Sequence, residues 1–322
     1  MNSNPIFQSV KPDMLLLNQE IMSQFNSNVP LVEKIAEYII KSGGKRLRPL
    51  IVMLVAQGCG YQGNLHIKLA TVIEFLHTAT LLHDDVVDTS DQRRGKPTAN
   101  AQWGNAPSVL VGDFVYSRAF ELLVEIGRLP IMGCLARATS LIAEGEVRQL
   151  MNIKNPDITE DDYMKVIQGK TATLFEAAAF SAAVLADAND DVCHAMNEYG
   201  RHLGLAFQIV DDILDFTGDA LTMGKNVGDD LAEGKATLPL IRAMEIGTDE
   251  QRACIRNAIR SGSLDDLAII QEAITSTGAL DYCLVKAKEQ AILAIQQLRC
   301  LPESEQKSHL EGLANLAVNR IK

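Results

Sequence analysis

The sequence predicts an all-α protein folded as one domain, residues 1–322, with about ten or more helices around a central cavity. Apolar residues recur at helical spacing along most of the chain, and no stretch alternates apolar and polar residues over several strands. Glycines and prolines fall between these periodic stretches, where they end helices. Hydrophobic residues make up 47% of the chain and aromatic residues only 5%, so we expect a large aliphatic core.

Charge and cysteine content exclude several classes of function. The net charge is −11, which argues against nucleic acid as a partner because binding its phosphate backbone requires a basic surface. None of the six cysteines forms a Cys-x-x-Cys pair, so no zinc or thioredoxin-like site is predicted. The chain shows neither a signal-peptide pattern nor about 18 uninterrupted apolar residues, so we expect a cytoplasmic protein without a transmembrane helix.

Helices alternate with short breaks in the first part of the chain. The predicted helices cover residues 13–25, 31–41, 50–56 and 67–88. Gly43 and Gly44 end the second of these helices, and a basic turn with Lys45 and Arg48 leads into the third. Backbone N–H groups at a helix start, together with fixed cations, are suited to binding an anion.

The helix 67–88 ends in an Asp-Asp-x-x-Asp motif set in apolar sequence. Asp84 and Asp88 are four residues apart, so they lie on one face of the helix with Asp85 beside them. Like charges on one face repel unless a cation neutralises them, and Mg²⁺ prefers oxygen ligands of this kind. His77 lies two turns before Asp84 on the same face and is either a core histidine or a ligand contact.

Residues 89–105 are predicted to form a polar loop without periodicity. The loop carries Arg93 and Arg94, whose guanidinium groups suit phosphate. Beyond it we expect helices at residues 108–127, 130–150, 159–186, 189–215 and 238–246, then amphipathic helices through 250–322 that supply only core and packing surface.

Lys170 and Thr171 lie inside the predicted helix 159–186. They follow a glycine but do not form a P-loop, because Met164 stands where that motif needs its first glycine. A lysine among alanine, leucine and phenylalanine requires an anion or access to water.

A second Asp-Asp-x-x-Asp motif ends the helix 189–215. Asp211 and Asp215 are again four residues apart, and Gln208 lies on the same face as Asp211. A glycine-rich loop with Lys225 and Lys235 follows. One such motif is more often a solvated acidic surface, but two in apolar contexts with basic clusters nearby indicate a metal–diphosphate site.

These motifs closely resemble those of the trans-polyprenyl diphosphate synthase family, and most closely the bacterial octaprenyl diphosphate synthases, which supply the side chain of respiratory quinones such as ubiquinone. The resemblance extends over nearly the whole chain, from Gly43-Gly44 to Thr237. It implies the isoprenoid synthase fold, a homodimer, and two substrates, isopentenyl diphosphate and an allylic diphosphate such as farnesyl diphosphate. It also implies Mg²⁺, with three ions around the allylic diphosphate.

The resemblance assigns roles residue by residue. The metal ligands would be Asp84, Asp85, Asp88, Asp211 and Asp215. The allylic diphosphate would contact Arg93, Lys170, Lys225 and Lys235. The isopentenyl diphosphate pocket would contain Lys45, Arg48, His77 and Arg94. The catalytic set would be Asp84, Asp85, Asp88, Lys170, Thr171, Gln208 and Asp211.

A mechanism follows from these charges. Mg²⁺ and cations stabilise a departing diphosphate and leave an allylic cation in an apolar cavity. The double bond of isopentenyl diphosphate attacks the cation, a proton is lost to the diphosphate, and dipoles of Thr171 and Gln208 stabilise the cation. Ala79 is small, so the growing chain should pass it and end at deeper residues such as Leu76, Leu123 or Met132. A long, octaprenyl product is predicted, with transient membrane contact for its release.

Two alternatives differ in class. A terpene cyclase or head-to-head coupling enzyme also ionises diphosphates with Mg²⁺, but lacks the set Lys45, Arg48 and Arg94 for a second diphosphate. A non-catalytic partner subunit of a prenyl synthase tends to lose the first Asp motif or the arginine pair, and this chain keeps both. A calcium-binding module is excluded because neither motif has the required loop pattern.

Overall fold

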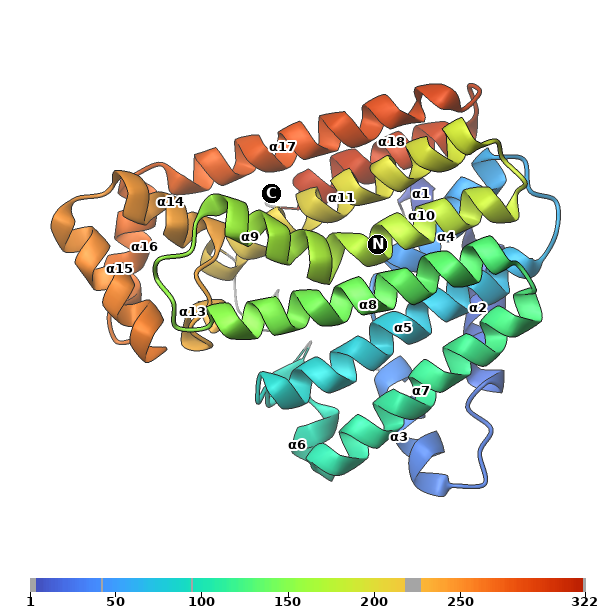
Figure 1. The fold of residues 1–322 in the computed structure, drawn as a ribbon, viewed down its shortest axis with the longest axis horizontal. Helices are drawn as coiled ribbons and strands as arrows, with labels where there is room; N and C mark the ends of the chain where they lie inside the picture. The colour runs from blue at the N-terminus through green and yellow to red at the C-terminus, as the bar shows by residue number, and fades with distance from the viewer. Residues whose placement is uncertain (1–3, 42, 94, 218–226, 321–322) are drawn as a thin grey trace. The chain divides into compact units, whose positions relative to one another are not determined.

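The computed structural model describes residues 4–41, 43–93, 95–217 and 227–320, which are almost entirely helical (Figure 1). From the N-terminus, the elements are α1 (Pro5–Ser9), α2 (Lys11–Ser23), α3 (Pro30–Lys41), α4 (Leu47–Gly58), α5 (Leu65–Val87), β1 (Gln92–Arg93), β2 (Lys96–Pro97), α6 (Ala99–Trp103), α7 (Asn105–Ile126) and α8 (Leu129–Asn152). They continue with α9 (Glu160–Ile167), the π-helix η1 (Gln168–Ala172), α10 (Thr173–Leu185), α11 (Asp190–Thr217), α13 (Asp229–Ala232), α14 (Leu238–Ile246), α15 (Asp249–Ser261), α16 (Leu267–Ser276), α17 (Ala279–Gln297), the 3₁₀-helix η2 (Leu298–Cys300) and α18 (Glu305–Val318). The predicted all-α class is confirmed.

The chain forms two compact units, each assembled from three separate stretches. The first unit comprises residues 1–139, 174–200 and 297–313, and the second comprises residues 140–173, 201–296 and 314–322. One Asp motif falls in each unit. That the whole chain is a single domain around a central cavity stays a prediction.

The first unit is built on α4 and α5. Every residue of α4 from Pro49 to Ala56 is buried, as expected for a helix that is apolar on all sides. In Figure 1, α5 runs beside α7 and, at its other side, beside α4. Within the described residues, α5 alone is long and apolar enough to cross a membrane, but 67% of its apolar window is buried in the protein, so it serves as a core helix.

The predicted loop at residues 89–105 contains regular structure, which corrects that expectation. Strands β1 and β2 form a two-residue antiparallel hairpin in which Gln92 pairs with Pro97 and Arg93 with Lys96. Helix α6 follows directly, and the side chain of Thr98 caps it by accepting from the N–H of Ala101. A cap residue followed by only one and a half helical turns gives too short a period to detect in sequence.

The second unit contains two features that the sequence did not predict. The expected helix through residues 159–186 is interrupted by the π-helix η1, and the expected loop after residue 217 includes the one-turn helix α13. Elsewhere in this unit, α14, α15 and α16 enclose an aliphatic core. Its members include Leu231, Leu240, Ile255, Ile259, Ile270 and Ile274.

Candidate active site

In the first unit, the basic turn and the middle of α5 are brought together. The guanidinium of Arg48 lies over the ring of Phe175, 4.4 Å from its centre. Its Nη1 donates to Nε2 of His77 at 3.2 Å, since a guanidinium has no acceptor. Arg48 is therefore held by stacking and by a hydrogen bond, and Lys45 is exposed nearby in sequence. Arg48 and His77, both predicted to bind isopentenyl diphosphate, are in contact with each other, and their role stays a prediction.

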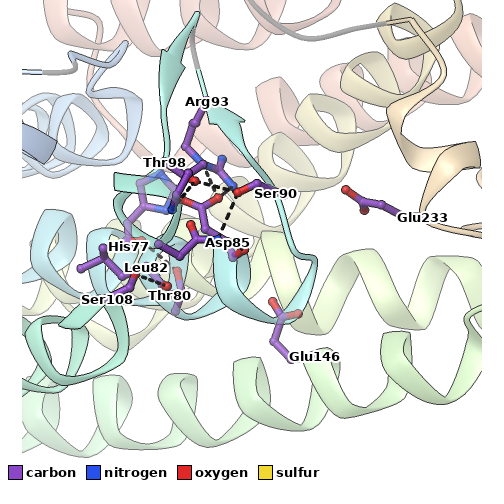
Figure 2. A network of polar contacts seen from close by, with 12 residues as sticks. His77, Thr80, Leu82, Asp85, Ser90, Arg93, Thr98, Ser108, Glu146 and Glu233 are labelled. Atoms are coloured by element: carbon purple, nitrogen blue, oxygen red, sulfur yellow. Dashed lines mark hydrogen bonds and ion pairs between the residues drawn. The ribbon is translucent and has the colours of Figure 1, made fainter. Parts of the chain in front are cut away.

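The first Asp motif lies at the end of α5, with Asp84 and Asp85 in its last turn and Asp88 as its C-cap residue. Asp85 is buried, and Asp84 and Asp88 are half-buried. Figure 2 shows Arg93 extending from β1 onto Asp85, whose Oδ1 accepts from Nε at 2.9 Å and from Nη2 at 2.7 Å. The amide of Asn100 in α6 donates to the backbone oxygen of Asp85 at 3.1 Å, so the short helix fixes the motif as well.

Asp85 and Arg93 thus form an ion pair at the edge of the motif. The Asp85 side chain is 6% exposed and that of Arg93 is 31% exposed, so the cation faces outward from a buried carboxylate. A pair of this kind orients the guanidinium for a second anion. The hairpin that carries Arg93 is itself tied back, since the Thr98 hydroxyl donates to the oxygen of Ser90 at 2.7 Å.

In the second unit, Lys170 lies on the π-helix opposite α8. Its Nζ is 2.7 Å from Oε2 of Glu146. The two helices meet at glycines: a side chain added at Gly145 would lie 2.7 Å from the backbone nitrogen of Lys170, and one added at Gly169 would lie 3.3 Å from the Cα of Gly145. Short π-helical segments within α-helices are frequent at functional sites, and this one carries both Lys170 and Thr171.

A chain of hydrogen bonds joins the π-helix to the second Asp motif. The Thr171 hydroxyl donates to Oε1 of Gln208 at 2.9 Å, and Nε2 of Gln208 donates to Oδ1 of Asp212 at 2.8 Å. The other carboxylate oxygen of Asp212 accepts from the Tyr163 hydroxyl at 2.7 Å. Thr171 and Gln208, predicted to act together, are in direct contact.

Asp212 is the innermost carboxylate of this motif, only 2% exposed. Burial raises its pKa well above the ordinary value, the charge of Asp230 adds to this, and the bonds from Tyr163 and Gln208 oppose it. Burial likewise raises the pKa of Tyr163, which therefore remains a hydroxyl donor. Asp211 is more exposed, at 43%.

The segment after the second motif folds back onto it. The N–H of Gly228 donates to the backbone oxygen of Asp215 at 2.9 Å, which places α13 against the end of α11. The N–H of Lys235 donates to the oxygen of Asp230 at 2.8 Å, and the Lys235 ammonium forms an ion pair with Glu233. Lys235 is thus held close to Asp230 and Glu233, in the segment that follows the second Asp motif.

Arg320 corrects the expectation that residues 250–322 supply only packing surface. Its Nη2 donates to the backbone oxygen of Phe207 at 2.8 Å, and its guanidinium stacks on the Phe207 ring at 3.9 Å. Nη1 lies 3.9 Å from Oδ1 of Asp211. Burial lowers the pKa of Arg320, and Asp211 opposes that shift. A cation from the far end of the sequence therefore faces the first carboxylate of the second motif.

Some predicted residues cannot be placed. Arg94 and Lys225 lie outside the described residues. Within the parts of the chain that are described, no three His, Cys, Asp or Glu side chains lie close enough together to hold a metal ion by themselves. The donors predicted for the metal are all carboxylates, which suits Mg²⁺, an ion that commonly binds one or two carboxylates and completes its shell with substrate phosphate and water.

Four of the polar residues described above were not predicted from the sequence: Glu146, Tyr163, Asp212 and Arg320. Asp212 had a signal, because it belongs to the second motif itself. The other three are separated from their partners by 24 residues or more, and nothing in their local sequence indicates the contact.

Comparisons with known proteins agree with this chemistry. The model of the polyprenyl synthetase family matches residues 29–276. Octaprenyl diphosphate synthase of Escherichia coli K12 is 50% identical over 321 residues, 99% of either chain. All-trans-nonaprenyl-diphosphate synthase (geranyl-diphosphate specific) of Rhodobacter capsulatus is 47% identical over 98% of this chain and 97% of its own.

The fold agrees equally well with a solved structure. A polyprenyl synthase from Caulobacter crescentus CB15, complexed with calcium and isoprenyl diphosphate, superposes with a TM-score of 0.95 at 43% identity, covering 98% of this chain and 97% of that one. The family condenses isopentenyl diphosphate with allylic diphosphates and depends on Mg²⁺. The chain belongs to the polyprenyl synthetase family and is a prenyltransferase that makes long all-trans polyprenyl diphosphates.

Proposed function

We propose that this enzyme extends farnesyl diphosphate with isopentenyl diphosphate to octaprenyl diphosphate, the forty-carbon precursor of ubiquinone side chains. The observation that carries the proposal is the full-length similarity, at 50% identity, to an octaprenyl diphosphate synthase. A nonaprenyl product is the second candidate, because a relative of that name is nearly as similar, at 47% identity.

The two diphosphates would be bound in different ways. The isopentenyl diphosphate would bind Lys45, Arg48, His77 and Arg94 without metal, and the held guanidinium of Arg48 supports this. The allylic diphosphate would bind Arg93, Lys170, Lys225 and Lys235, together with Mg²⁺, three ions in all, held by Asp84, Asp85, Asp88, Asp211 and Asp215. When bound, Mg²⁺ would stabilise the negative charge that grows on the departing diphosphate.

Thr171 and Gln208 would act on the allylic cation. The Thr171 hydroxyl donates its hydrogen bond to Gln208, so the lone pairs of the hydroxyl oxygen remain available to a positive charge. The oxygen of Gln208 carries the negative end of the amide dipole. Replacing Gln208 with Leu should therefore lower kcat, and unchanged kcat in that variant would refute the role.

A homodimer is the proposed assembly. Four apolar side chains of α8 in the second unit are exposed by 48% to 78%: Leu141, Val147, Leu150 and Met151. A second copy covering such a face would remove apolar surface from water. A cytoplasmic location, with transient membrane contact during product release, is part of the same proposal.

The test is to incubate the purified enzyme with farnesyl diphosphate, labelled isopentenyl diphosphate and Mg²⁺ and to resolve the products by length. We expect one long product, abolished by EDTA because the carboxylates then lack their ion. Absence of incorporation with any allylic primer would instead favour a non-catalytic partner subunit. A main product one unit longer would select the nonaprenyl candidate.

A further inference from the structure

The hydrogen-bond chain of the second unit contains a residue to which no role has been assigned. Tyr163 is 4% exposed and lies on α9, seven residues before Lys170 and 49 residues before Asp212. Its hydroxyl bonds to Asp212 at 2.7 Å, and Asp212 in turn bonds to Gln208, which accepts from Thr171. The chain thus runs from a buried tyrosine to the two side chains proposed to face the allylic cation.

We propose that Tyr163 is a positioning residue for prenyl transfer: its hydroxyl fixes the Asp212 carboxylate, which holds the Gln208 amide with its oxygen on the Thr171 side. This inference rests on the proposed role of Gln208.

Fixing the amide matters because its two ends have opposite polarity. As observed, the NH₂ group of Gln208 faces a carboxylate oxygen and the amide oxygen faces the Thr171 hydroxyl. Turned over, the amide would set oxygen against the Asp212 oxygen and present NH₂, its positive end, beside Thr171. A positive end there would destabilise a carbocation, so the orientation bears on the transition state more than on substrate binding.

Asp212 can hold the amide only if it is itself held. A buried carboxylate with a single donor retains rotational freedom about its terminal torsion, which is broad and two-fold. Tyr163 and Gln208 occupy different oxygens, so the carboxylate plane is fixed from both ends.

The helix that carries Tyr163 is anchored in its turn. At its N-terminus Thr159 and Asp162 form a capping box. In its first turn Glu160 accepts from the Tyr282 hydroxyl at 2.6 Å and pairs with Lys286 at 2.9 Å, both on α17.

The test is Tyr163→Phe, which removes one hydroxyl and keeps the ring. Loss of one well-formed hydrogen bond should lower kcat about tenfold. The KM for each diphosphate should change by less than about twofold, because Tyr163 makes no substrate contact in the proposal. Calorimetric titration of the variant with inorganic pyrophosphate and Mg²⁺ should give the wild-type stoichiometry and affinity, which shows that the loss is not a loss of folded sites.

Tyr199→Phe is the matched control. Tyr199, in the other unit, is likewise a buried tyrosine, and its hydroxyl donates to the backbone oxygen of Leu310 at 2.8 Å. Tyr199→Phe should lower the melting temperature by about as much as Tyr163→Phe does, because each variant loses one buried hydrogen bond. It should leave kcat at the wild-type value.

A double-mutant cycle with Gln208→Leu tests the route. If Tyr163 acts through Gln208, adding Tyr163→Phe to Gln208→Leu should lower kcat by less than about twofold more. The inference would be overturned if the two substitutions lowered kcat additively, or if Tyr163→Phe alone left kcat unchanged. It would also be overturned if kcat fell only in proportion to the pyrophosphate stoichiometry. Absence of product from the wild-type enzyme would instead defeat the proposed function.

Discussion

Three cations proposed to hold the allylic diphosphate lie beside carboxylates in the folded chain. Arg93 pairs with Asp85 and Lys170 with Glu146, each at 2.7 Å, and Lys235 pairs with Glu233. Figure 2 draws three of these acidic residues, Asp85, Glu146 and Glu233. Each pair satisfies a cation before substrate arrives, so a diphosphate must displace or share the carboxylate. At Asp85, which is a proposed metal ligand, bound Mg²⁺ would favour that exchange by interacting with the carboxylate in place of Arg93.

Arg48, which is proposed to bind isopentenyl diphosphate, is oriented by the Phe175 ring beneath its guanidinium and by its hydrogen bond to His77. We therefore expect Arg48→Met to raise the KM for isopentenyl diphosphate by about tenfold or more, since a hydrogen bond to a charged group is worth about 1.5–3 kcal/mol. The KM for the allylic diphosphate should stay within about twofold. Steady-state kinetics with each substrate varied in turn measures both values.

Arg128→Met serves as its control, because Arg128 pairs with Asp187 on an exposed surface. It should leave both KM values unchanged. An equal rise of the two KM values in Arg48→Met would mean that Arg48 is not specific to one diphosphate.

For single residues, the sequence shows which side chains are candidates for the site, but it does not show which other side chains they contact. Asp84, Asp88, Lys170 and Gln208 stand out because polar groups in apolar helices are costly without a function. Tyr163 does not stand out, because a tyrosine in an amphipathic helix is an ordinary core residue. Its contact with Asp212 spans 49 residues, a separation that only the tertiary fold closes.

Helices are the elements that periodicity predicts well, and the exceptions have identifiable causes. The prediction for residues 67–88 differs from α5 by two residues at its start and one at its end. The π-helix η1 escaped detection because its residues are compatible with an α-helix. Its geometry accompanies the close approach of another helix at Gly145, which the local sequence does not encode.

Gly145→Ala tests this helix contact. The added methyl would lie 2.7 Å from the Lys170 nitrogen and 2.9 Å from the Gly169 carbonyl carbon, both backbone atoms. We expect a loss of about 1–3 kcal/mol in unfolding free energy, typical of overpacking, together with reduced kcat because Lys170 and Thr171 shift. Urea unfolding and the incorporation assay measure the two effects.

The same helix supplies a control in Gly133→Ala. There the nearest atom would be Nη1 of Arg137 at 3.5 Å, an ordinary contact, so alanine should stabilise the helix by about 0.5–1 kcal/mol. If Gly145→Ala and Gly133→Ala changed the unfolding free energy and kcat equally, the close contact of Gly145 with the π-helix would contribute nothing to stability or activity.

The contacts of Glu160 with Tyr282 and Lys286, which hold α9 against α17, should be sensitive to pH. Burial alone would raise the pKa of Glu160, but hydrogen bonds from Tyr282 and Lys286 outweigh it and leave the pKa below its ordinary value. A carboxyl with a lowered pKa in the folded state stabilises it above the unfolded pKa and loses this effect as the pH falls through the folded pKa.

Glu160→Gln should therefore be less stable than wild type at pH 7, by up to about 1 kcal/mol for a partly exposed pair. The difference should shrink as the pH falls below about 4. Urea unfolding of both proteins at neutral and acidic pH gives the comparison, and a difference that is constant with pH would contradict it.

At the scale of the molecule, each unit presents one Asp motif with cations of its own. The first unit combines Asp85 with Arg93, and the second combines Lys170 with Glu146 beside the Gln208 network. Sequence order accounts for the first grouping, because Arg93 lies in the segment that directly follows the helix of Asp85. The second grouping joins residues of three separate helices, so only the tertiary fold brings it together. The partition into units built from interleaved stretches was not predictable from motifs, since it depends on long-range packing.

Product length is the property that depends on the core of the first unit. Ala79 is fully buried in α5, one turn before Asp84, and Leu76 and Leu123 are each 1% exposed. If the prenyl chain grows past Ala79, a large side chain there should stop it. Ala79→Tyr should shift the product to shorter chains, and the shift is measured as the ratio of product lengths under the same assay. Because unfolded molecules make no product, this ratio does not depend on how much of the variant folds, so an unchanged distribution would show that the chain does not pass Ala79.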